Sequence, residues 1–134
     1  MFKSNEKLKG DTQMSEKPKY SIIIIATNQI KYTTRCIDSL YKYTKDFELI
    51  IVDNFCDDGT TGYLASLPYE NVKTIRTNRK ETFSTNNNLG LQLAEGKYVI
   101  FLNNDTVVTP DWAERMENHF KNVPLNHIGA VGPV

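Results

Sequence analysis

The sequence predicts an α/β fold with a mostly parallel sheet of about five strands flanked by helices. Three observations carry this prediction. β-branched apolar runs recur along the chain, segments of helical length and pattern separate them, and turn residues mark the junctions. Such runs are typical of strands buried on both faces, as in parallel sheets. Strands that alternate with helices join through right-handed crossovers and form a layered α/β domain.

The first half of this pattern begins with residues 20–26, where four consecutive isoleucines indicate a buried strand. A helix is expected over residues 31–44, because apolar residues recur there at helical spacing. Its apolar face contains Cys36, Ile37, Leu40 and Tyr41. Residues 47–53 form a second buried run, and an Asp-Gly-Thr turn separates it from a short helix at residues 61–67.

The second half repeats the alternation. Residues 72–76 form a third and weaker strand. A helix is expected over residues 83–94, with Gly96 ending it, and residues 97–103 form a fourth strand.

The last helix is expected to begin at Thr109 and Pro110, as a hydroxyl cap followed by proline at the first helical position is a favoured start. Its apolar face contains Trp112, Met116 and Phe120. A short final strand is expected at residues 128–131.

Composition places the chain among single globular domains. It has 134 residues, 40% hydrophobic and 24% charged. Residues 1–19 are polar and rich in Lys and Glu, and we interpret them as a flexible leader before a domain at 20–134. The formal net charge is zero, from 16 basic and 16 acidic residues. This balance does not indicate the basic surface that binds nucleic acid.

The expected location is the cytoplasm, including the inner face of the membrane. No apolar run is long enough to span a bilayer, and no signal peptide is visible. Cys36 and Cys56 have neither a disulfide framework nor metal-ligand spacing, which favours a reducing compartment. We expect Cys36 in the core and Cys56 in an exposed loop.

Polar side chains follow three strands of the expected sheet. Thr27 and Asn28 follow the first strand, Asp53 ends the second, and Asn103 and Asp105 lie at the end of the fourth. Ligands of open α/β sheets bind beyond the carboxyl ends of the strands, so these groups are expected to converge on one ligand.

The first strand–helix turn contains no glycine. This excludes the glycine-rich dinucleotide loop and the phosphate loop. A diphosphate would then need another counter-charge. A divalent cation held by Asp105 supplies it, because carboxylate and phosphate oxygens are the hard ligands that Mg²⁺ or Mn²⁺ prefers.

Some of these residues also suit other roles. The segment 103–106 is similar to the Asp-x-Asp-x-Thr of aspartyl-phosphate phosphatases, but Asn103 cannot act as the nucleophile. Asp53 can cap the next turn, and Asp58 suits a structural Asp-Gly turn. Asparagine is a poor helix former, so the run 86–88 indicates either a pocket contact by at least one member or a frayed helix start.

Five motifs in order resemble those of family 2 glycosyltransferases, which have the GT-A fold. They occupy residues 21–29, 48–60, 83–90, 96–106 and 128–133. The resemblance therefore runs from about Tyr20 to the last residue. It is nearest to members that transfer rhamnose or similar sugars onto surface polysaccharides.

The resemblance implies roles for particular positions. Asp53 would accept a hydrogen bond from the nucleotide base, and Asp105 would ligate a Mn²⁺ or Mg²⁺ ion bridging the diphosphate. Asn103 would contact the ribose through its carbonyl oxygen. The remaining nucleotide-binding positions are Thr27 and Asn28, which would flank the base, and Asn88, which would order the rim of the pocket. Asp58 would help to order this rim.

The chain also departs from the family pattern. Thr27 replaces a tyrosine that would form an aromatic wall beside the base, and Asn87 stands where many relatives carry a basic residue. Relatives continue past Val134 with the acceptor site and the catalytic base, so no catalytic residue is assigned here.

The implied function is metal-assisted sugar transfer from a UDP- or dTDP-sugar to a hydroxyl of a glycan or lipid-linked acceptor. This chain would supply the donor-binding half of the enzyme, truncated before the acceptor half. On its own it would have little or no activity. The alternatives are a non-catalytic nucleotide-sugar-binding module and a structural or assembly module. An uncovered sheet edge would favour self-association.

Overall fold

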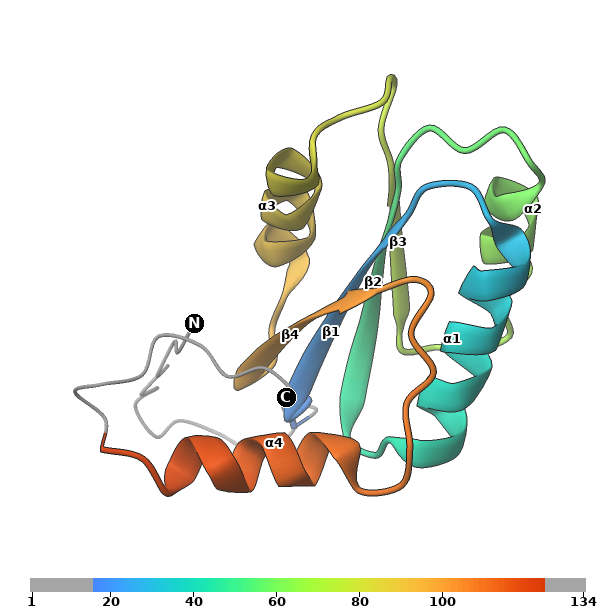
Figure 1. Cartoon of the computed structure of the whole chain (residues 1–134). Helices are drawn as coiled ribbons and strands as arrows, with labels where there is room; N and C mark the ends of the chain where they lie inside the picture. Colours follow the sequence, from blue (N-terminus) through green and yellow to red (C-terminus); the bar gives the residue numbers. More distant parts are fainter. Residues whose placement is uncertain (1–15, 125–134) are drawn as a thin grey trace.

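The computed structural model describes residues 16–124, which form a four-stranded, fully parallel sheet in the order β3-β2-β1-β4 (Figure 1). The strands are β1 (Tyr20–Ala26), β2 (Phe47–Asp53), β3 (Val72–Arg76) and β4 (Tyr98–Asn103). The predicted α/β class and parallel sheet are confirmed. The described residues contain four strands where about five were expected, and the strand expected at residues 128–131 lies outside them.

Helices cover both faces of this sheet (Figure 1). They are α1 (Ile30–Tyr43), α2 (Thr60–Ala65), α3 (Phe83–Leu93) and α4 (Trp112–Lys121). Side chains of α1, α2 and α4 share one core with alternate residues of β1 and β2. α3 packs on the opposite face against the same two strands.

The period of two along β1 divides its isoleucines between the two faces. Ile22 and Ile24 join the core beneath α1, whereas Ile23 lies against α3. All three are buried, as the apolar run predicts for a central strand. β4 forms one edge of the sheet, and its residues are half-buried or exposed.

α3 approaches β1 closely through Gly90. A Cβ at this position would lie 2.5 Å from Cγ2 of Ile23 and 3.5 Å from Cγ2 of Val52. Ile23 is buried, and a β-branched side chain has few rotamers with which to move away. The helix therefore needs glycine here to reach the sheet.

We expect Gly90→Ala to destabilise the domain. Alanine gains about 1 kcal/mol in helix propensity, but overpacking a filled core costs about 1–3 kcal/mol. The steric clash should outweigh the gain in helix propensity and lower the urea concentration at the midpoint of unfolding. Gly62→Ala is the matched control, because a Cβ at Gly62 in α2 would meet nothing within 4 Å. A Gly90→Ala midpoint equal to or above that of the wild type would contradict the close packing.

The last helix begins later than predicted. α4 starts at Trp112, with Asp111 at its N-cap at φ 60°, and not at Thr109 and Pro110. The preceding segment is held against α1: Val108 is buried, and its N–H donates to Ser39 Oγ at 3.0 Å. This tertiary contact keeps the chain extended past the local helix signal.

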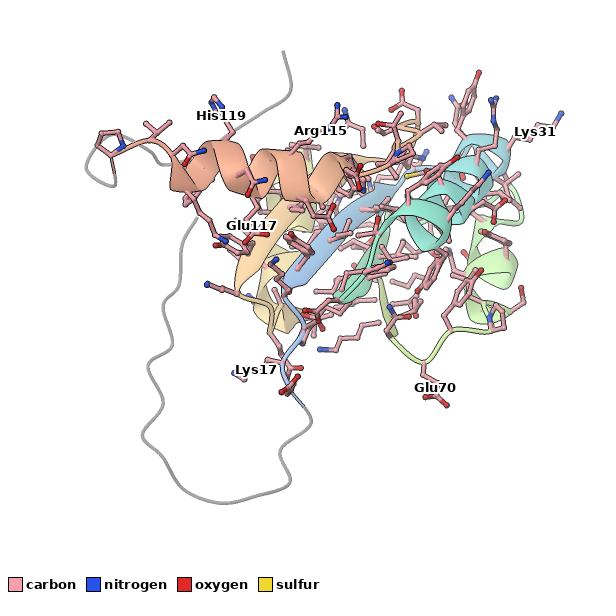
Figure 2. All side chains as sticks on the ribbon, turned by 90° about the horizontal axis from the view of Figure 1, so that it is seen from below. Lys17, Lys31, Glu70, Arg115, Glu117 and His119 are labelled. Carbon is pink, nitrogen blue, oxygen red and sulfur yellow. The ribbon has the colours of Figure 1, made fainter. Side chains whose placement is uncertain are left out.

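The buried face of α4 also differs from the expected apolar stripe. Glu117 is buried, whereas Trp112, Met116 and Phe120 are half-buried. The Glu117 carboxylate accepts a hydrogen bond from Tyr20 Oη at 2.5 Å. Figure 2 shows Glu117 on the side of α4 that faces the sheet. Periodicity of apolar residues alone therefore misplaces the packed face of this helix.

Two residues assigned to the leader take part in the fold. The carbonyl of Pro18 accepts from Lys97 N at 3.3 Å, and that of Lys19 accepts from Tyr98 N at 2.9 Å. Lys19 Nζ also lies 2.7 Å from Glu117 Oε2. Residues 1–15 lie outside the described part.

None of the helices among residues 16–124 has the length and apolar character needed to cross a membrane.

Candidate functional site

The sheet order creates one switch point, between β1 and β4. The chain passes from β1 to β2 through α1 on one face, and from β3 to β4 through α3 on the other (Figure 1). The carboxyl ends of β1 and β4 are thus left with a crevice between them, where ligands of open α/β sheets bind. A cavity of about 230 Å³ lies here.

The polar wall of this cavity contains three of the six residues predicted to bind donor and metal. Thr27, Asn103 and Asp105 line it together. The other polar groups are Asn87 of α3 and Asn104. No lysine or arginine of the described residues lines it. The wall is therefore built of neutral hydrogen-bonding groups and a single carboxylate.

Asp105 is the group best suited to a cation. It is exposed, and it forms no hydrogen bond or ion pair with any of residues 16–124. No cluster of three or more His, Cys, Asp or Glu in that range could hold a metal by itself. A free carboxylate beside amide oxygens fits a hard divalent ion whose remaining ligands come from phosphate and water.

Asn104 anchors the turn that carries Asp105. Its Nδ2 donates to Thr33 Oγ1 at 3.0 Å and approaches the carbonyl of Asn28 at 3.5 Å. The turn after β4 is thereby tied to the first turn of α1. Sequence reasoning did not assign a role to Asn104, and only the contact with a residue 71 positions away gives it one.

Asp53 lies outside the cavity. Its carboxylate accepts from Cys56 N at 2.9 Å and Thr61 Oγ1 at 2.6 Å, and it pairs with Arg76 Nη1 at 2.8 Å. Burial of the carboxyl raises its pKa, but these hydrogen bonds outweigh burial and hold the pKa below its usual value. Asp53 closes the turn after β2, and its predicted contact with the base stays a prediction.

Asn28 also lies outside the cavity lining. It adopts φ 56°, and its side chain both donates to Asp57 Oδ1 at 2.8 Å and accepts from Asp57 N at 2.9 Å. This exchange clamps the loop after β1 to the loop after β2. The Asn28 amide is thus engaged within the protein, and its predicted contact with the base stays a prediction.

The asparagine run on α3 contributes through a different member than predicted. Asn88 is exposed and does not line the cavity, whereas Asn87 does. Successive helical residues are about 100° apart around the axis, so only part of such a run can face one site. Asn86 is buried, and its Nδ2 donates to the carbonyl of Glu81 at 3.3 Å.

Asp58 caps two helices. Its carboxylate accepts from Ile30 N at 3.0 Å, at the start of α1, and from Thr60 N at 3.1 Å, at the start of α2. The preference for a structural turn role agrees with this geometry.

Cys56 is buried, and the expectation that it is exposed was wrong. Its thiol lies between the loop after β1 and the loop after β2, 3.1 Å from the carbonyl of Ala26 and 3.1 Å from Asn28 N. Burial raises the thiol pKa to about 11. Cys36 is buried in the core, as predicted.

The apolar wall of the cavity was not anticipated. It contains Ile25, Phe83, Phe101 and Leu102. Phe83, the first residue of α3, is 62% exposed, and Phe101 of β4 is 46% exposed. A phenylalanine within a helix or strand pattern is normally interpreted as a core residue. No local signal distinguishes a core phenylalanine from one at a cavity.

Fold and cavity together define a Rossmann-like α/β domain with a cavity at the switch point of its sheet, where ligands of such folds bind. Residues 21–131 match the family described as Glycosyl transferase family 2. The chain belongs to this family.

Several curated relatives support this assignment. Protein CgeD of Bacillus subtilis (strain 168) is 30% identical over 115 residues, which are 79% of this chain and 27% of that protein. Poly(ribitol-phosphate) beta-N-acetylglucosaminyltransferase TarS of Staphylococcus aureus (strain Mu50 / ATCC 700699) is 29% identical over 118 residues, covering 80% and 20%. The chain therefore spans about a quarter or less of the length of these relatives.

Solved structures share the fold. Mannosyltransferase PcManGT from Pyrobaculum calidifontis, in complex with GDP-Man and Mn²⁺, superposes with a TM-score of 0.68 at 17% identity, over 77% of this chain and 32% of that one. TarS 1–349 of S. aureus gives a TM-score of 0.69 at 22% identity, over 85% and 38%. The domain is thus a partial GT-A fold.

Proposed function

We propose that this domain is the donor-binding part of a glycosyltransferase and binds a nucleoside diphosphate sugar together with a divalent cation. The observation that carries the proposal is the free carboxylate of Asp105 in a cavity at the switch point. The complete enzyme would transfer the sugar to an acceptor hydroxyl.

The charge of the cavity determines how a diphosphate could bind. Two phosphates bring negative charge into a site lined by one carboxylate and no basic residue of the described chain. A divalent cation would supply the missing positive charge and neutralise the leaving diphosphate. Asp105 would hold this ion in place, and a cation without nucleotide should bind weakly because a single protein carboxylate holds it.

The neutral groups would orient the rest of the donor. Asn103 offers a carbonyl acceptor and amide donors to ribose or sugar hydroxyls, and Asn87 of α3 offers the same groups. Thr27 adds a hydroxyl at the end of β1. Phe83 and Phe101 would cover apolar faces of the ligand and exclude water.

The comparisons guide the choice of ligands. PcManGT is described with GDP-Man and Mn²⁺, and TarS is named for transfer of N-acetylglucosamine to poly(ribitol-phosphate). By analogy with PcManGT we infer a nucleoside diphosphate sugar as donor and Mn²⁺ or Mg²⁺ as the ion. Beyond that analogy, we propose a UDP- or dTDP-sugar as donor and a glycan or lipid-linked acceptor at the cytoplasmic side of the membrane.

A second candidate is a nucleotide-sugar-binding or assembly module without catalysis. The absence of a basic residue among the described lining groups favours it. Such a module would bind donor but show no turnover when the remainder of a family enzyme is supplied. The half-exposed edge strand β4 would then serve self-association, which light scattering across a range of concentrations would detect.

Calorimetric titration of the chain with UDP and dTDP, with and without Mn²⁺, tests the proposal. We expect binding that requires Mn²⁺, with Mn²⁺ alone giving little heat. A folded sample that binds neither nucleotide in the presence of Mn²⁺ would overturn the donor-binding role and favour a structural one.

A further inference from the structure

Phe55 is an exposed aromatic residue in the loop that leaves β2. Its side chain is 42% exposed, and its backbone lies at φ 53°. Left-handed backbone is uncommon for a bulky residue, and exposure forgoes the gain from burying the ring. Nothing about the turn itself requires a phenylalanine at this position.

The surrounding turn holds this conformation in place. Phe55 N donates to the carbonyl of Asp53 at 2.9 Å, and Cys56 N donates to Asp53 Oδ1, also at 2.9 Å. Cys56 is buried between the two loops. With its neighbours fixed on both sides, Phe55 is directed away from the core.

Arg76 supports one face of the ring. Its Cζ lies 5.1 Å from the ring centroid, within the range of a cation–π contact. The guanidinium is itself anchored, to Asp53 Oδ2 at 2.8 Å, Thr61 Oγ1 at 2.5 Å and the carbonyl of Cys56 at 3.1 Å. The ring therefore has a fixed orientation and a cation behind it, and its exposed surface remains available.

The position of this ring matches one end of the proposed donor. β2 neighbours β1, and Asp53 is in register with Ala26. Asn54 Nδ2 reaches Thr27 Oγ1 at 3.5 Å, so the loop carrying Phe55 adjoins the cavity. The ends of β2 and β4 are separated by two strand spacings, roughly 10 Å. A ribose and diphosphate can bridge this gap between Phe55 and Asp105.

We propose that Phe55, supported by Arg76, is the stacking platform for the nucleobase of the donor. This inference rests on the proposed function and assigns its base subsite to the loop after β2. Stacking accepts any base because every base has a π-face. The platform should therefore bind uracil and thymine nucleotides with similar affinity, and discrimination between them must come from other contacts.

The test compares a ligand with a base and one without. Phe55→Asn removes the ring while keeping a residue that tolerates positive φ, and Phe55→Gly does the same without a side chain. In the presence of Mn²⁺, we expect both variants to bind UDP about tenfold or more weakly, the size of one lost base stack. Binding of inorganic pyrophosphate with Mn²⁺ should be unchanged, and Phe55→Tyr should restore UDP affinity.

The outcomes separate this inference from the function on which it rests. Unchanged UDP affinity in Phe55→Asn and Phe55→Gly, with a wild type that binds UDP, would overturn the platform and leave donor binding intact. An equal loss for UDP and pyrophosphate would also overturn it, since the ring would then act only through folding. A folded wild type that binds neither ligand would overturn both.

Discussion

Asp105→Asn should abolish the Mn²⁺-dependent binding of UDP while leaving the fold intact. The substitution keeps the shape of the side chain and removes the only carboxylate among residues 16–124 that lines the cavity. The cation would then have no charged protein ligand, and the diphosphate would enter a neutral site without a counter-charge. Loss of an outer-sphere partner of a metal typically costs about 10–100-fold in affinity, so losing the ligand itself should cost at least that much.

Asp111→Asn is the matched control. Asp111 is an exposed aspartate six positions away, and its side chain makes no capping hydrogen bond. Asparagine tolerates its φ of 60°. Calorimetry on both variants should show loss only for Asp105→Asn, while thermal unfolding shows both folded. Equal Mn²⁺-dependent affinity in Asp105→Asn and the wild type would refute Asp105 as the metal ligand.

Glu117→Ala should cause a large loss of stability at neutral pH. The buried carboxylate accepts from Tyr20 Oη at 2.5 Å and pairs with Lys19 and Lys121 at 2.7 and 2.5 Å. Breaking a buried ion pair typically costs about 3–5 kcal/mol. The lower end applies here because both lysines can turn to water. The free energy of unfolding in urea, measured at pH 7, would give this value.

The same carboxylate predicts how stability depends on pH. Burial raises the pKa of Glu117, but hydrogen bonds from Lys121, Lys19 and Tyr20 prevail and lower it to about 2 from 4.5. A group with a depressed folded pKa stabilises the fold above its unfolded pKa and loses this contribution as pH falls through the folded value. The wild type should therefore lose stability between about pH 4.5 and 2, and the gap to Glu117→Ala should narrow over that window.

Glu70→Gln provides the control for the charge itself. Glu70 is exposed and lies far from α4 in Figure 2. Its unfolding curves should follow those of the wild type at each pH. A gap between wild type and Glu117→Ala that stays constant from pH 7 to 2 would show that packing, and not the ionised carboxylate, accounts for the loss.

Local sequence signals predicted most of the secondary structure. β1, β2 and β3 have the predicted bounds, because a run of β-branched residues favours a strand through the residues of the run themselves. The prediction that the last helix begins at Thr109 was wrong, because Val108 N donates a hydrogen bond to Ser39 of α1, 69 positions away. The prediction that Cys56 is exposed was also wrong because of a long-range contact. The Cys56 thiol is buried against Ala26 and Asn28, which belong to another part of the chain.

Only some residues of the candidate site could likewise be predicted from local signals. Thr27, Asn103 and Asp105 could be predicted because they follow strands whose carboxyl ends meet at the switch point. Asn28 and Asp53 follow strands too, yet their polar atoms are hydrogen-bonded to Asp57, Thr61 and Arg76. Whether a polar side chain is free for a ligand depends on partners that its own segment does not contain.

By itself, the sequence determined the α/β class, the order of strands and helices along the chain, the family and the strand ends that line the cavity. These follow from burial periodicity and from short motifs, which are properties of neighbouring residues. The tertiary structure decided which polar groups remain available, where α4 begins, that Glu117 is buried, and that Phe55 is held outward over Arg76. Each of these depends on contacts between elements far apart in the chain, and hydrogen-bond satisfaction is a property of the assembled fold.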